Sequence, residues 1–192
     1  MSSKILVLPG DGIGVEVSDQ AIRVIDKLNE YGLDASYEKD LVGGASYDSN
    51  GEPLTSDVLE KAKNSDAILL GAVGGSKWDN VERSKRPEAG LLGLRKELEL
   101  FANLRPALVF EALVSASTLK NEVVNNLDIM IVRELTGGVY FGQPRGIEDT
   151  THGKKAIDTQ VYYDYEIDRI ARVAFDLAKK ETIKLLLLKK QM

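Results

Sequence analysis

The sequence contains no cysteine and only one histidine among its 192 residues. Without cysteine the chain can form neither a disulfide bond nor a reactive thiolate, which is consistent with a reducing, cytoplasmic environment. The single histidine, His152, has no second histidine at a spacing suited to metal binding. We therefore expect no disulfide-stabilised fold and no histidine-based metal centre.

Long apolar segments and long runs of like charge are also missing. No stretch approaches the roughly 20 apolar residues that span a bilayer, and the run Ile5–Leu8 is too short for a signal peptide because Pro9 and Gly10 interrupt it. The 25 basic and 30 acidic residues give a net charge of −5 and form no basic tract. The composition predicts a globular cytoplasmic protein with no nucleic-acid or membrane partner.

Short apolar runs that end in glycine alternate with segments of helical periodicity. Lys4–Leu8 and Asp66–Val73 are typical of buried strands, and each is followed by glycines. Residues 15–31 place apolar side chains at helical spacing, namely Val17, Ala21, Val24, Ile25 and Leu28. This alternation favours an α/β fold with an open, mostly parallel sheet.

The same patterns divide the rest of the chain. We expect strands at Ala35–Val42, Ala107–Phe110 and Leu127–Val132, and helices after Thr55 or Ser56, over Leu91–Leu100 and over Tyr165–Lys180. The last helix is expected to bury one face, made by Ile167, Ile170, Ala171, Ala174, Phe175 and Ala178. Residues 78–90 are expected to form a loop, and residues 136–159 an irregular hairpin.

Two glycine-rich segments follow strands and are candidates for binding a cofactor. Gly10–Gly14 departs from the Gly-x-Gly-x-x-Gly pattern, because Val15 stands where the third glycine is expected, and a plain tight turn explains it equally well. Gly71–Asp79 ends another strand in the same way. Together, the two segments could bring two flexible backbones to one cofactor.

Three arginines and one tyrosine are the candidates for binding and converting a small acid: Arg95, Arg105, Arg133 and Tyr140. Guanidinium groups bind carboxylates with two parallel hydrogen bonds, so three of them can hold a malate-like diacid. A phenol can donate a proton to a carbon atom. The ordinary alternatives are surface ion pairs for the arginines and a core position for the tyrosine.

Several blocks of sequence together resemble the 3-isopropylmalate dehydrogenases of the isocitrate/isopropylmalate dehydrogenase family. The blocks are Gly10–Gly14, Gly74–Asp79, Leu94–Lys96, Asn103–Pro106 and Arg133–Gly138. The resemblance extends from Lys4 to about Lys180. It implies that Arg95, Arg105 and Arg133 hold the malate carboxylates, that Tyr140 is the catalytic acid, and that Leu91 and Leu92 form the pocket for the isopropyl group.

The resemblance also implies the cofactors and the reaction. The segment from Gly75 to Glu88 resembles the first nicotinamide-cofactor loop, with candidate contacts at Gly75, Ser76, Lys77, Trp78, Asp79 and Glu88. The family oxidises 3-isopropylmalate with NAD and decarboxylates it, with Mg²⁺ or Mn²⁺, to 2-oxoisocaproate in leucine biosynthesis. It acts as a homodimer whose subunits interlock through the hairpin, here residues 136–159. The alternatives are a related tartrate, malate or homoisocitrate dehydrogenase, and a non-catalytic fragment that binds full-length subunits.

The resemblance divides the chain into three parts. We expect residues 1–100 to begin the cofactor-side domain and residues 101–180 to begin the substrate and dimerisation domain. Residues 181–192 are expected to be a frameshifted tail, because plausible codons read one nucleotide out of register give Asn-Asn-Lys-Val-Thr-Ser-Val-Glu-Lys-Ala-Asn, the family's next block. The base lysine, the metal ligands and the second cofactor loop belong to the family's other half. The 192-residue chain is therefore predicted to be inactive alone.

Overall fold

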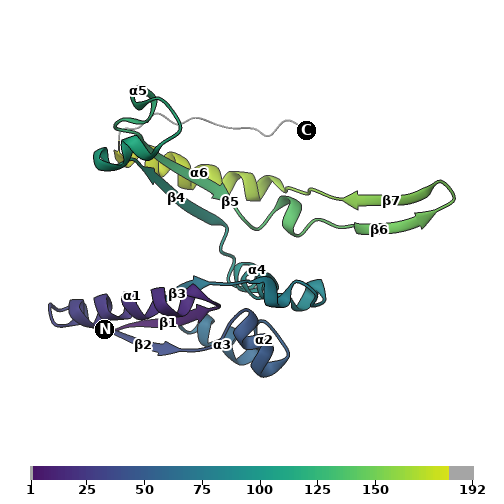
Figure 1. Cartoon of the computed structure of the whole chain (residues 1–192), viewed down its shortest axis with the longest axis horizontal. Coiled ribbons are helices and arrows are strands. Elements are labelled where there is room, and N and C mark those ends of the chain that lie inside the picture. Colours follow the sequence, from purple (N-terminus) through teal and green to yellow (C-terminus); the bar gives the residue numbers. More distant parts are fainter. Residues whose placement is uncertain (1, 182–192) are drawn as a thin grey trace. The chain divides into compact units, whose positions relative to one another are not determined.

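The computed structural model describes residues 2–181, in two compact units that are considered separately (Figure 1). The first unit is Met1–Leu98 and the second is Glu99–Met192. The sequence analysis places the boundary between residues 100 and 101. The expected frameshifted tail, apart from residue 181, lies outside the described residues.

The first unit contains a parallel three-stranded sheet with strand order β2-β1-β3. Its strands are β1 (Ser3–Gly10), β2 (Ala35–Lys39) and β3 (Ala67–Ala72). Its helices are α1 (Ile13–Asn29), α2 (Gly44–Asn50), α3 (Ser56–Lys63) and α4 (Pro87–Glu97). This architecture confirms the expected α/β fold with parallel strands.

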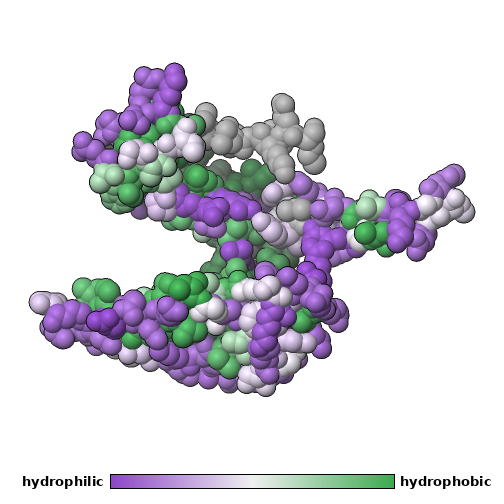
Figure 2. Space-filling model, viewed as in Figure 1, coloured by the Kyte–Doolittle hydropathy of each residue, from purple (hydrophilic) through white to green (hydrophobic). Residues whose placement is uncertain are grey.

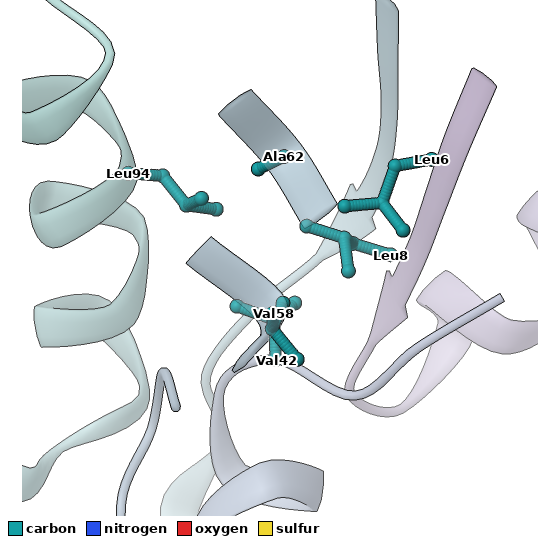
Figure 3. Packing of buried hydrophobic residues seen from close by; sticks show 6 residues of the cluster. All are labelled: Leu6, Leu8, Val42, Val58, Ala62 and Leu94. Atoms are coloured by element: carbon teal, nitrogen blue, oxygen red, sulfur yellow. The ribbon is translucent and has the colours of Figure 1, made fainter. Parts of the chain in front are cut away.

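The core of the first unit forms around the central strand β1. Leu6 and Leu8 are almost completely buried because neighbouring strands and helices enclose β1. They pack with side chains from α3, α4 and the segment after β2 (Figure 3), namely Val42, Val58, Ala62 and Leu94. The expected helix start after Thr55 is confirmed, since the Thr55 hydroxyl oxygen accepts a hydrogen bond from the Val58 N–H at 3.3 Å.

The buried face of α1 differs from the expected one. Val17, Val24 and Leu28 are 56%, 59% and 47% exposed, whereas Gly14 and Ser18 are buried. Small residues are needed here because the helix lies very close to the sheet: a Cβ atom on Gly14 would lie 2.2 Å from the Pro9 carbonyl oxygen. Periodicity therefore gave the helix correctly, but of the apolar residues at helical spacing only Ala21 and Ile25 are half-buried.

Two helices of the first unit also differ from expectation. The helix expected from Leu91 begins at Pro87, within the segment expected to be a loop, because proline at the first helical position loses no internal hydrogen bond. Short 3₁₀ turns at Ser76–Trp78 and Arg83–Lys85 precede it. Helix α2 was not predicted, since Gly44–Asn50 consists mostly of glycine, serine, aspartate and asparagine, and Ala45 is its one strong helix former.

The second unit is built from two antiparallel strand pairs and one long helix. Strands β4 (Ala102–Leu108) and β5 (Asp128–Glu134) form one pair. Strands β6 (Arg145–Thr150) and β7 (Gly153–Asp158) form the expected hairpin. The remaining elements are α5 (Asn121–Val124), α6 (Asp164–Glu181) and 3₁₀ turns at Glu111–Ala116 and Gly138–Tyr140.

Hydrophobic side chains remain exposed on both units (Figure 2). In α6 the expected buried face is only partly correct, because Ile167 and Phe175 are 58% and 62% exposed while Glu166 is buried. On β5, Ile129 and Ile131 are about half exposed. Within residues 2–181, no helix is long and apolar enough to cross a membrane.

Candidate functional site

The glycine-rich segments of the first unit meet at the carboxyl ends of β1 and β3. These parallel strands are neighbours, with Gly10 opposite Ala72. Asp11 follows β1, is 4% exposed, and connects this end of the sheet to two other segments. Its carboxylate accepts backbone N–H bonds from Gly44 at 2.9 Å, Ala45 at 2.7 Å and Gly74 at 2.8 Å. Carboxyl ends of parallel strands are where open α/β sheets bind ligands.

A second carboxylate, Asp48 in α2, holds the side chains of the expected cofactor loop. The Lys77 ammonium lies 2.6 Å from Asp48 Oδ2, and the Trp78 indole N–H donates to Asp48 Oδ1 at 3.1 Å. The hydrogen bond from Lys77 and then that from Trp78 lower the pKa of Asp48 below its ordinary value. Lys77 and Trp78 are therefore directed towards α2.

The expected cofactor and substrate residues of α4 share one face of that helix. Glu88, Leu91, Leu92 and Arg95 follow the spacing of residues on one side of a helix, and none of them is buried. The opposite side enters the core through Pro87, Gly90 and Leu94. Glu88 also reaches the glycine loop, since a Cβ atom on Gly74 would lie 2.7 Å from Glu88 Oε1.

In the second unit, the β4–β5 pair places two of the predicted arginines on one face. Asn103 is opposite Arg133, and Arg105 is opposite Ile131. Because opposite residues share a face and every second residue along a strand does so too, Arg105 and Arg133 are diagonal neighbours. Both are exposed. Arg105 lies inside β4, because that strand begins at Ala102, before the expected start at Ala107.

Tyr140 lies directly beside Arg133. The Arg133 Nη2 donates a hydrogen bond to the Tyr140 hydroxyl oxygen at 2.7 Å, and the Arg133 guanidinium carbon lies 5.7 Å from the centre of the tyrosine ring. The hydroxyl accepts in this bond, so its own proton is free for another acceptor. Tyr140 is 37% exposed, which excludes the alternative of a buried core aromatic.

The opposite face of β5 carries a charged network that the sequence analysis missed. Glu134 accepts from the Arg169 guanidinium at 3.1 Å and from the Gly137 N–H at 2.7 Å. Arg169, in α6, also donates to Thr136 and lies 4.6 Å from the centre of the Phe101 ring. The network fixes the chain between β5 and Tyr140. Strict alternation along the strand was the signal available, since Glu134 must face away from Arg133.

The predicted site residues thus fall into two groups, one in each unit. Gly75–Asp79, Glu88, Leu91, Leu92 and Arg95 belong to the first unit, and Arg105, Arg133 and Tyr140 to the second. The structure brings together Arg133 with Tyr140, and Glu88 with the glycine loop. Convergence of all three arginines on one ligand stays a prediction.

A comparison with protein families finds that the model described as isocitrate/isopropylmalate dehydrogenase matches residues 4–192. The chain belongs to this family. The matched range includes residues 181–192. That these residues are a frameshifted tail stays a prediction, which the gene sequence would test.

The relatives share high identity with this chain over about half of their length. The 3-isopropylmalate dehydrogenase of Chromohalobacter salexigens is 58% identical over 186 residues, which are 96% of this chain and 52% of that protein. The 3-isopropylmalate dehydrogenase of Pelagibacter ubique is 60% identical over 181 residues, covering 93% of this chain and 49% of the relative. The chain thus spans about half the length of the curated relatives it matches.

Solved structures of the same type share the fold. The isocitrate dehydrogenase of Methylococcus capsulatus is 28% identical with a TM-score of 0.70, over 95% of this chain and 49% of that one. A β-decarboxylating dehydrogenase from Thermococcus kodakarensis is 31% identical with a TM-score of 0.66, over 94% of this chain and 47% of that one. The expected fold class is confirmed.

Proposed function

We propose that this chain carries the amino-terminal part of an NAD-dependent 3-isopropylmalate dehydrogenase of leucine biosynthesis. The observation that carries the proposal is the pair formed by Arg133 and Tyr140, with 2.7 Å between Nη2 and the phenol oxygen, on the face that also bears Arg105. The names of relatives that are 58–60% identical support the substrate. In this proposal the complete protein oxidises and decarboxylates 3-isopropylmalate to 2-oxoisocaproate in the cytoplasm.

In this proposal each group of residues has a separate task. Arg105 and Arg133 bind the carboxylates of the diacid through paired hydrogen bonds, and the resemblance to the family assigns carboxylate binding to Arg95 as well. Tyr140 gives its proton to the carbon atom from which carbon dioxide has left. Two apolar side chains on α4, Leu91 and Leu92, take the isopropyl group.

The cofactor is assigned to the first unit. A bound NAD would supply the acceptor for the hydride that leaves C2, the carbon atom that bears the hydroxyl group. The residues that would hold it are those of the loop after β3, with Glu88 near Gly74: the exposed Gly75, Ser76, Lys77 and Asp79, and the half-buried Trp78. Asp11 lies at the carboxyl ends of the paired strands β1 and β3 and accepts a hydrogen bond from the Gly74 N–H at the start of that loop.

No metal site is assigned to the residues that the structure describes. Among residues 2–181, no three acidic or histidine side chains lie close enough together to hold a metal ion. The described residues therefore do not fit Mg²⁺ or Mn²⁺, and no step proposed here goes through a metal. The inactivity of the chain alone stays a prediction from the resemblance.

The β6–β7 hairpin is proposed as the dimerisation arm. Ile147 in β6 is 73% exposed, which is unfavourable for an apolar side chain unless another surface covers it. A fragment that retains this arm could also join full-length subunits without catalysing anything. Mixing the chain with an intact homologue and measuring molecular mass by light scattering tests this second function: a species containing one fragment and one full-length subunit supports it.

Activity tests the main proposal most directly. The purified chain, supplied with 3-isopropylmalate, NAD and Mg²⁺, should form no NADH at 340 nm, whereas a version with the reading frame restored should turn over. In that restored version Tyr140→Phe should lower kcat by about 10²- to 10⁴-fold, the usual contribution of a general acid. Tyr31→Phe is the matched control, since Tyr31 is 78% exposed. Faster turnover of malate, tartrate or homoisocitrate than of 3-isopropylmalate would contradict the substrate assignment.

A further inference from the structure

The loop after β3 is attached to α2 at three points. Asp48 binds both the Lys77 ammonium, at 2.6 Å, and the Trp78 indole N–H, at 3.1 Å. The indole lies against Gly44, where a Cβ atom would be only 2.2 Å from Trp78 Cζ2. Asp11 joins the same two segments, because Oδ2 accepts from the N–H groups of both Gly44 and Gly74. The side chains of Lys77 and Trp78 are thus held by α2, and the backbone at Gly74 shares the Asp11 carboxylate with the start of the same helix.

The charge of Lys77 is already paired in this arrangement. A free lysine in such a loop would be expected to bind a cofactor phosphate as a point charge. Here the ammonium has a carboxylate partner at 2.6 Å and lies 5.2 Å from the centre of the Trp78 ring. Binding a phosphate would require it to leave both partners. Gly75 and Ser76, by contrast, are exposed. Gly75 has no side chain, and within residues 2–181 the Ser76 hydroxyl makes no hydrogen bond to another residue.

We propose that Asp48 is a positioning residue for the cofactor loop: it fixes Lys77 and Trp78 on α2, so that these two residues act on the cofactor through the loop backbone and not by direct contact. The proposal rests on the cofactor site proposed above. It changes the role of two residues in that site from ligands to anchors, and it adds a residue from α2, which the sequence analysis did not predict as a helix.

The single tryptophan of the chain makes the proposal measurable. Asp48→Asn keeps the shape of the side chain but removes its charge and one acceptor, so the indole should become more accessible. An exposed charged pair contributes no more than about 1 kcal/mol, so its loss should raise the population of the detached loop about two- to fivefold. We expect the quenching constant of Trp78 fluorescence by acrylamide to rise by a similar factor. Glu60→Gln in α3 is the control, since it makes the same chemical change at an exposed position of the same unit. It should leave the quenching constant unaltered.

A double-substitution cycle separates an anchor from a ligand. NADH affinity is measured for the full 192-residue chain by energy transfer from Trp78, for Asp48→Asn, for Lys77→Met and for both together. If Lys77 acts through Asp48, each single substitution weakens NADH binding about two- to fivefold and the double substitution weakens it no further. If Lys77 touches a phosphate, Lys77→Met causes the same additional loss whether or not Asp48 is present.

Each outcome has one meaning. Higher quenching in Asp48→Asn together with a non-additive cycle supports the proposal. Unchanged quenching in Asp48→Asn overturns it, and so does an additive cycle. It is also overturned if Asp48→Asn raises the quenching but leaves the NADH affinity unchanged. If the unsubstituted chain binds no NADH at millimolar concentration, the cycle is measured in the version with the reading frame restored, which includes the second cofactor loop. Failure to bind there as well refutes the cofactor site and the proposal with it, whereas a change in quenching would still locate the tryptophan on α2.

Discussion

The replacement of Asp11 by asparagine should destabilise the first unit strongly, although it removes only a charge. The two carboxylate oxygens of Asp11 accept three backbone N–H groups, two of them at Oδ2. An asparagine has a single oxygen, so its best orientation keeps the bonds from Gly44 and Gly74 and turns the amide NH₂ towards the N–H of Ala45. A donor then faces a donor beside a largely buried group.

The magnitude follows from these bonds. One unsatisfied buried N–H costs about 1–3 kcal/mol, and the two remaining bonds lose the extra strength that a charged acceptor gives. We expect a total loss of about 2–4 kcal/mol. With a urea m-value of about 1–3 kcal/mol/M, the unfolding midpoint should fall by roughly 1–2 M. Asp11→Ala removes both acceptor oxygens, so that all three N–H groups lose their partner, and should lower the midpoint further.

Urea unfolding followed by Trp78 fluorescence measures this loss within the correct unit, since Trp78 is the only tryptophan and lies in Met1–Leu98. Asp19→Asn serves as control: Asp19 forms an ion pair with Lys39 at 2.8 Å, but both side chains are about half exposed, so less than about 1 kcal/mol is expected. An Asp11→Asn midpoint within 0.5 M of the unsubstituted chain, a margin of roughly 1 kcal/mol, would refute the reasoning, because it would mean that the three N–H groups find other acceptors.

Three further predictions concern the same loop and the second unit. Gly44→Ala must displace the indole of Trp78, whose Cζ2 lies 2.2 Å from the new Cβ position; it should cost about 1–3 kcal/mol and shift the tryptophan emission, and an unshifted spectrum would contradict the packing. The pKa of Asp48 is lowered, so its contacts persist above the ordinary carboxyl pKa and are lost only as the pH falls through the lower folded value; Trp78 emission should change below about pH 4 at constant far-UV circular dichroism, and Asp48→Asn should abolish that transition. Glu134→Gln leaves the partly buried Arg169 without its closest carboxylate at 3.1 Å and should cost about 1–3 kcal/mol, whereas thermal unfolding at an unchanged temperature would show that Glu166 replaces it.

Most elements of the first unit, α2 excepted, could be predicted because they had a local signal. β1 is a continuous apolar run, as expected for a strand covered on both faces, and Thr55 is a standard helix cap. The face of α1 could not be predicted in the same way. Gly14 faces the sheet because a Cβ atom there would lie 2.2 Å from the Pro9 carbonyl oxygen of β1, a close approach that depends on how the helix packs on the sheet and not on periodicity.

The candidate site was predictable to a different degree in its two parts. The resemblance to the family supplied the residues of the loop after β3, but no pattern in the sequence relates this loop to α2, which lies about 30 residues earlier and has poor helix formers. The contact depends on Gly44 leaving room for the indole. Asp48 was therefore missed. Its partners Lys77 and Trp78 were predicted as cofactor contacts, whereas in the structure both side chains bind Asp48 of α2.

The pair Arg133 and Tyr140 illustrates what alternation along a strand can add to a resemblance. With Arg133 on one face of β5, Glu134 must lie on the other, where α6 packs and Arg169 neutralises it. This places a charged residue on each side of the strand, and the inner one ties down Thr136 and Gly137, the residues that lead to Tyr140. The short Arg133–Tyr140 bond then depends on a network on the opposite face, so substitutions at Glu134 should disturb the phenol although they touch neither partner.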